Sequence, residues 1–231
     1  MESQARRTSL FLAMLFIAAI GIVAFHPVAQ GGSGAERLAS VIEQSRAAQV
    51  VHGAVMAILL IFGVAMVGFS QTLGLGRATV RTALTAFMLA IVMSFFAMTV
   101  DGFVIPAIGQ RCASASRECL ATTMIMFGFA AILVQMFTKI ALFLIAASIA
   151  MWSLAMIKRD LQWRIVAGIG FVSACVQTLL LIGPAAYLTP HSLIMIFAVQ
   201  SLWFFGLVWL VGFRNPEDRS ALSATGSKIP R

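Results

Sequence analysis

Long apolar stretches alternate with short polar segments along the 231 residues of this chain. A bilayer core about 30 Å thick is crossed by a helix of roughly 20 residues, and six stretches approach or exceed that length. They cover residues 10–25, 51–72, 82–105, 136–157, 165–186 and 193–213. Their apolar positions are continuous, whereas the strands of a membrane β-barrel would alternate apolar and polar positions. The pattern therefore predicts an all-α polytopic membrane protein, a six-helix transmembrane bundle.

Two of these helices are expected to continue beyond the membrane. Residues 35–72 and residues 120–157 contain no proline, and residues 35–50 are amphipathic at helical spacing. We expect helical extensions on the periplasmic side over about residues 35–50 and 120–135. The second extension is largely apolar, so protein must cover it, because it would otherwise form a large exposed hydrophobic patch. The polar residues 214–231 predict a disordered cytoplasmic tail.

The two sets of helix ends differ in positive charge. Eleven lysines and arginines fall on one set, and four fall on the other, namely Arg37, Arg46, Arg111 and Arg117. Short cytoplasmic loops carry the excess of positive charge, so we expect both termini in the cytoplasm of a bacterial inner membrane. The first apolar run follows Arg6-Arg7, as in a secretory signal peptide, but its 16 residues exceed the usual hydrophobic region. We therefore expect a retained first helix, with cleavage as the alternative.

The composition supports the membrane class. Hydrophobic residues make up 61% of the chain and charged residues 10%, against roughly 45–50% and about 25% in soluble domains. These values exclude a soluble enzyme and a disordered regulator. The net charge of +8 does not indicate nucleic-acid binding, because the basic residues are spread thinly between apolar runs. The expected partners are the lipid bilayer and a membrane partner subunit or a second copy of the chain.

Two of the three cysteines share a short polar loop on the less basic side. These are Cys112 and Cys119, and that side is the predicted periplasmic one, where disulfides persist. We expect a disulfide between them, with two free thiols as the alternative.

Few titratable side chains lie within the apolar runs, and they gather at one depth near the expected periplasmic leaflet. They are His26, His52, Asp101, Lys139 and His191. Ionisable residues are expensive in a membrane, so each invites a functional hypothesis. Asp101 and Lys139 are expected to form a structural ion pair between the third and fourth helices.

The three histidines together with Asp101 also make a candidate metal site. Neutral imidazoles bind zinc, copper and iron, and a carboxylate serves as a ligand, as a partner of a ligating histidine or as a general base. Haem held by His52 and either His26 or His191 is a further option. The alternative is that each histidine is an interfacial residue without a ligand.

Short motifs mark several helices: His26-Pro27, His52, Asp101-Gly102-Phe103-Val104-Ile105-Pro106, Trp152-Ser153 and Gln200-Ser201-Leu202-Trp203-Phe204. In these the chain resembles a group of uncharacterised bacterial six-helix inner-membrane proteins. The resemblance covers most of the chain and implies the same fold, without a biochemical activity. The His and Asp layout is also loosely similar to the zinc-dependent intramembrane hydrolases related to alkaline ceramidases. Their HxxxH pattern is not matched, because Met195 stands four residues after His191.

We therefore expect a non-catalytic inner-membrane component that binds a lipid, a quinone, a metal or a partner protein near the periplasmic leaflet. The alternative is a metal-dependent intramembrane hydrolase or redox protein that uses His26, His52, Asp101 and His191. A small-molecule transporter is the third hypothesis, disfavoured because the sequence lacks the internal repeats and paired broken helices of many transporters.

Overall fold

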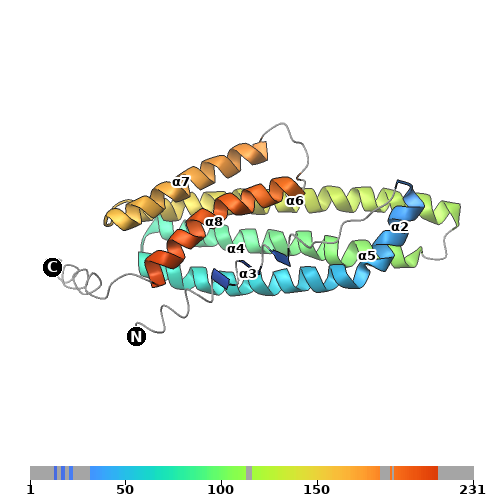
Figure 1. Cartoon of the computed structure of the whole chain (residues 1–231), viewed down its shortest axis with the longest axis horizontal. Coiled ribbons are helices and arrows are strands. Elements are labelled where there is room, and N and C mark those ends of the chain that lie inside the picture. The colour runs from blue at the N-terminus through green and yellow to red at the C-terminus, as the bar shows by residue number, and fades with distance from the viewer. Residues whose placement is uncertain are drawn as a thin grey trace.

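The computed structural model describes residues 13–14, 17–18, 21–22, 32–112, 116–182, 188 and 190–212. Most of the first predicted span (10–25) and the predicted tail (214–231) lie outside them. The helices are α2 (Gly34–Glu43), α3 (Ser45–Leu73), α4 (Ala78–Thr99), the π-helix η1 (Val100–Val104), α5 (Ile105–Arg111), α6 (Arg117–Met156), α7 (Leu161–Ile182) and α8 (Pro190–Gly212) (Figure 1).

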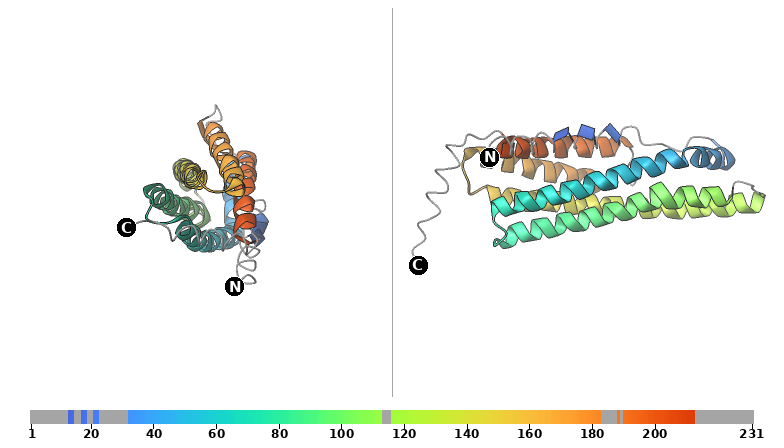
Figure 2. Two further views of the ribbon diagram at one scale, coloured as in Figure 1. Left: turned by 90° about the vertical axis from the view of Figure 1, so that its left-hand side faces the viewer. Right: turned by 90° about the horizontal axis from the view of Figure 1, so that it is seen from below.

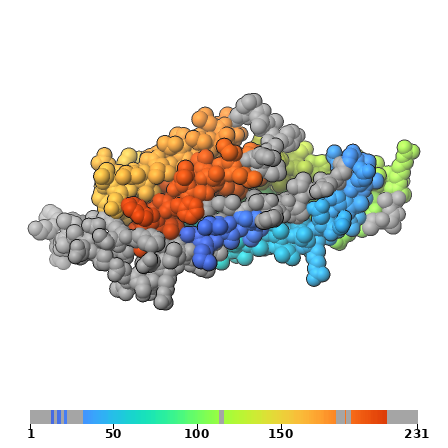
Figure 3. Space-filling view, viewed as in Figure 1, coloured from blue at the N-terminus to red at the C-terminus, as the bar shows by residue number. Residues whose placement is uncertain are grey.

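Helices α3, α4 and α6 run side by side along the length of the molecule, and η1 and α5 continue α4 in the same direction (Figures 1 and 2). The shorter α7 and α8 pack toward one end, whereas α2 lies at the other (Figure 3). The described residues include five helices that are long and apolar enough to cross a membrane. The predicted all-α polytopic bundle is confirmed by this architecture.

Aromatic side chains join the helices near the end where α3 stops and α4 begins. Trp152 of α6 stacks on Trp203 of α8 with ring centroids 5.9 Å apart, and its Nε1 donates to Ser70 Oγ of α3 at 3.0 Å. Both tryptophans are fully buried. At Gly170 of α7, an added Cβ would lie 2.6 Å from Cδ1 of Trp203, so α7 can approach this cluster only with a glycine there.

The lack of proline in residues 35–72 predicted one continuous helix, but this prediction is wrong. The structure has a break at Gln44, between α2 and α3. The break turns α2 across α5, and it buries Leu38 beside Gly109. A straight extension would leave the apolar side of the amphipathic α2 exposed, so a contact between distant residues overrides the local helical preference.

The third predicted span also continues past its expected end at residue 105. Proline inside a helix removes a backbone hydrogen bond and clashes with the preceding turn, so a straight α-helix through Pro106 would be disfavoured. The structure instead forms the π-turn η1, closed by a hydrogen bond from the N–H of Ile105 to the carbonyl of Val100. Pro106 then lies in the first turn of α5, where no N–H is required.

Helix α6 is uninterrupted over 40 residues, about 60 Å in length, as the absence of proline predicted. Its N-terminal part extends beyond α7 and α8 (Figure 1). Ile125 and Phe129 there are 75% and 64% exposed. The expectation that a partner subunit or a second copy covers this apolar surface stays a prediction.

Cys112 and Cys119 form the predicted disulfide, with their Cα atoms 5.9 Å apart. It joins the C-terminal end of α5 to the first turn of α6. The cross-link spans seven residues of sequence, and chain entropy gives a loop of that size a stabilisation of about 2 kcal/mol.

Replacing both cysteines by serine is therefore expected to lower the free energy of unfolding by about 2 kcal/mol. The measurement is equilibrium unfolding of the purified chain in mixed detergent under non-reducing conditions. Cys175→Ser is the matched control, because Cys175 is exposed and outside the disulfide. Equal stabilities of the double variant and this control would contradict the expected contribution of the cross-link.

Helix α2 begins with a capping box. The N–H of Glu36 donates to Ser33 Oγ at 3.3 Å, and Glu36 Oε2 accepts from the N–H groups of Ser33 and Gly32 at 3.0 and 2.8 Å. These backbone hydrogen bonds, with that from Ser33 the largest influence, hold the pKa of the Glu36 carboxyl below its ordinary value. The carboxylate form is thus favoured in the folded chain.

The start of α2 is expected to loosen in acid. Because the folded-state pKa of Glu36 is lowered, its stabilisation is fully present above the ordinary carboxyl pKa and is lost as the pH falls through the lowered value. Hydrogen exchange at the Ser33 amide checks this, with rates corrected for intrinsic pH dependence. Protection at neutral pH should fall in acid, and Glu36→Ala should remove it at both pH values. Protection that persists unchanged in acid would contradict this role.

Candidate functional site

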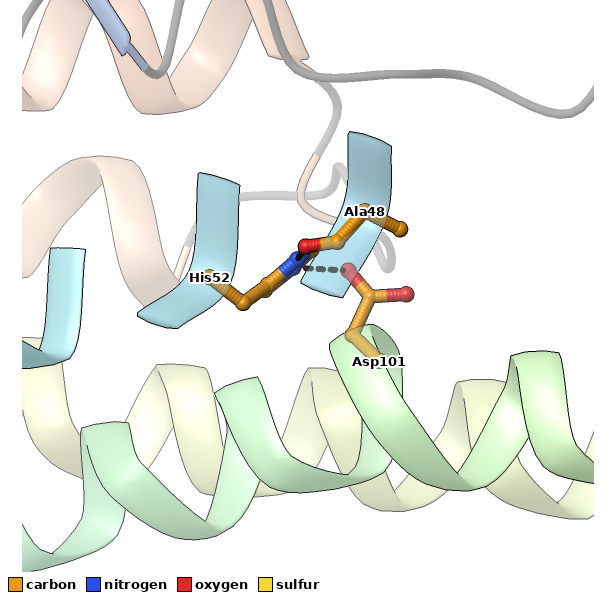
Figure 4. A network of polar contacts seen from close by, with 3 residues as sticks. All are labelled: Ala48, His52 and Asp101. Carbon is orange, nitrogen blue, oxygen red and sulfur yellow. Dashed lines mark hydrogen bonds and ion pairs between the residues drawn. The ribbon is translucent and has the colours of Figure 1, made fainter. Parts of the chain in front are cut away.

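The candidate site is a polar pair between α3 and the π-turn. His52 lies on α3 and is only 4% exposed, whereas the Asp101 side chain on η1 keeps 32% of its surface exposed. Nε2 of His52 lies 3.1 Å from Oδ2 of Asp101, and Nδ1 lies 2.7 Å from the carbonyl oxygen of Ala48 (Figure 4). Both ring nitrogens of His52 are therefore occupied by protein atoms.

This geometry places one proton between His52 and Asp101. The Ala48 carbonyl can only accept, so Nδ1 of His52 carries a hydrogen. If Nε2 and the carboxylate were both unprotonated, two acceptors would face each other at 3.1 Å. The pair is consequently an imidazolium with a carboxylate or an imidazole with a carboxylic acid. In either state a hydrogen bond from one group to the other fixes the Asp101 carboxyl.

Two features of the local sequence bring the pair together. Gly102 removes the side chain that would separate the helices: an added Cβ would lie 2.5 Å from Cβ of His52 and 2.6 Å from its Cγ. The π-turn that accommodates Pro106 contains Asp101, and single π-turns inside helices recur at functional sites. The Asp101-Gly102 pair and the nearby Pro106 are the sequence signals for this site, but they do not reveal that His52 is the partner of Asp101.

The structure brings together only part of the predicted metal set. His26 lies outside the described residues, and so does the side chain of His191, although its backbone lies in the first turn of α8. Within the described residues, no three His, Cys, Asp or Glu side chains are grouped as metal ligands. The zinc, copper and haem hypotheses therefore stay predictions, and ligation through either nitrogen of His52 requires one of its present hydrogen bonds to open.

The second predicted pair joins Asp101 to Lys139. Lys139 is half-buried on α6, and α6 contacts η1. The expected ion pair between Asp101 and Lys139 stays a prediction. The structure joins Asp101 to the His52 ring by a direct hydrogen bond. The sequence did not indicate this direct pairing.

Glutamine side chains of the apolar helices form hydrogen bonds to other helices and to the segment that precedes α8. Gln200 donates to Gln177, which donates to the Leu142 carbonyl, so α8, α7 and α6 are linked through one chain of amides. Gln135 binds both backbone groups of Leu188, at 2.8 and 3.0 Å. These contacts tie α7 and α8 to α6, and they satisfy polar groups that would otherwise be costly to bury.

Comparisons of the chain with protein-family models, curated proteins and solved structures found no match.

Proposed function

We propose that the chain is a non-catalytic component of the bacterial inner membrane that binds an amphipathic small molecule, a lipid or a quinone, near the periplasmic leaflet. The observation that carries this proposal is the hydrogen bond between buried His52 and partly exposed Asp101. His52 acts as a positioning residue, because both of its ring nitrogens already engage protein atoms. Asp101 is the side chain that a ligand can reach.

The surroundings of Asp101 suit a molecule with a polar head and an apolar tail. Phe103 and Val104 follow Asp101 on η1 and are 38% and 39% exposed, so exposed apolar side chains lie in the same helical turn as the carboxyl. A hydroxyl or ammonium head can donate to a carboxylate oxygen while its tail lies along apolar helix surface. Lipids and quinols share this combination of groups.

The orientation of the chain is part of the proposal. The disulfide between Cys112 and Cys119 lies beyond Asp101, at the end of the molecule that carries α5, and disulfides persist in oxidising compartments. The opposite end carries basic residues on the turns that precede α4 and α7, among them Arg77, Lys158 and Arg159. Both features favour a periplasmic position for the pair.

Native mass spectrometry of the chain purified from bacterial membranes in mild detergent tests the proposal. The wild type should retain a small molecule that Asp101→Leu loses and Glu43→Leu keeps, since Glu43 is exposed at the end of α2. Elemental analysis of the same samples, with His52→Ala beside them, addresses the alternative. Stoichiometric zinc, copper or iron that disappears in His52→Ala would contradict the proposal and favour a metal-dependent enzyme. A wild type without any bound molecule would contradict it too and would favour a partner protein as the ligand.

A further inference from the structure

A surface groove opens between α4 and α6 at the end opposite the His52–Asp101 pair. Its volume is about 390 Å³. Arg81, Thr82 and Thr85 line it within the first eight residues of α4. Ala86, Leu89 and Leu144 line it farther from the start of α4, and the small Ala78 lines it at the start itself. The groove thus changes from polar to apolar along the helix axis over about 12 Å, the rise of eight residues.

Other arginines at this end form hydrogen bonds within the protein. Arg77 donates to the Ala155 carbonyl at 3.4 Å, and Arg159 donates to the Thr72 carbonyl at 2.7 Å while its guanidinium lies over the Trp163 ring. These contacts hold helix C-termini, where carbonyl groups and the helix dipole favour cations. Arg81 is instead exposed on α4 and contributes its charge to the groove.

We infer that this groove binds an anionic phospholipid of the leaflet at the basic end of the bundle. The lipid phosphate lies against the Arg81 guanidinium, which suits bidentate phosphate recognition, and the hydroxyls of Thr82 and Thr85 donate to the headgroup. One acyl chain follows Ala86 and Leu89 toward Leu144 of α6. Charge complementarity selects this occupant, because the basic turns at this end attract anionic headgroups from the bilayer.

Lipid titration of the delipidated full chain in detergent, followed by native mass spectrometry, tests the inference. Phosphatidylglycerol and phosphatidylcholine are titrated separately into the wild type, Arg81→Gln and Arg164→Gln. Arg164 is a matched control because it is an exposed arginine at the same end but does not line the groove. Phosphatidylglycerol should bind the wild type more tightly than phosphatidylcholine does. Arg81→Gln should weaken its binding about fivefold, and Arg164→Gln should leave it unchanged.

Ala86→Leu provides an independent test at the apolar end. The larger side chain fills space that the acyl chain needs, so phosphatidylglycerol should bind less tightly while Arg81 is retained. Equal binding of the two lipids, or unchanged binding in both Arg81→Gln and Ala86→Leu, would overturn the inference. Displacement of the lipid by millimolar inorganic phosphate would also overturn it, because the site would then recognise a free anion. These outcomes do not depend on the ligand proposed for the other leaflet.

Discussion

Replacing Gly102 by alanine is expected to lower the free energy of unfolding by about 2–3 kcal/mol. The added Cβ would lie 2.5 Å from Cβ of His52, and that atom is fixed to the α3 backbone. Rotation of the His52 side chain cannot relieve this overlap, so α3 must move away from η1. The movement also stretches the hydrogen bond to Asp101. Equilibrium unfolding in mixed detergent measures the change.

Gly53→Ala is the matched control for this substitution. Gly53 follows His52 on the same helix, and nothing lies within 4 Å of the position its Cβ would take. Because alanine is the better helix former, the control should leave stability unchanged or raise it by up to about 1 kcal/mol. A similar loss of stability in both variants would contradict this explanation, because the loss in Gly102→Ala would then not come from overlap between α3 and η1.

The second large loss of unfolding free energy is expected when either His52 or Asp101 is replaced. Asp101→Ala leaves Nε2 of a His52 ring that is 4% exposed without its carboxyl partner, and we expect a loss of about 1–3 kcal/mol in unfolding free energy. His52→Ala removes both hydrogen bonds of the ring. The two losses should not add. In the double variant we expect a total about 1–2 kcal/mol smaller than the sum of the single losses.

A second double-mutant cycle supplies the comparison. Ser94 donates to the Ala90 carbonyl within α4 and lies seven residues before Asp101, about 10 Å along the helix axis. Losses in Ser94→Ala and Asp101→Ala should therefore add to within about 0.5 kcal/mol. Additivity in the His52 and Asp101 cycle as well would mean that the hydrogen bond between them contributes nothing to stability.

The membrane class and the all-helical architecture follow from the sequence because they depend on local composition. A continuous apolar run of about 20 residues has few stable forms besides a membrane helix. The uninterrupted α6 follows from the same kind of information, since no proline or turn signal divides it. The disulfide was predictable because its two cysteines lie only seven residues apart.

Features that depend on distant contacts were not predictable from local pattern. Gln44 is an ordinary helix former, and the break there follows from packing of Leu38 beside Gly109 of α5. The continuation through Pro106 depends on the π-turn, which an i, i+4 pattern does not anticipate. His52 and Asp101 are 49 residues apart, and a single sequence does not state which helix ends meet.

An experimental density map of the chain in a lipid bilayer would test the proposed ligand site at Asp101, near the periplasmic leaflet, most directly. We expect non-protein density with a tail along Phe103 and Val104 and a head within about 3 Å of the Asp101 carboxyl. The His52 ring should remain between Asp101 and the Ala48 carbonyl. A bilayer-embedded chain in which His52 has turned to ligate a metal, or in which ordinary solvent alone faces Asp101, would contradict the proposed site.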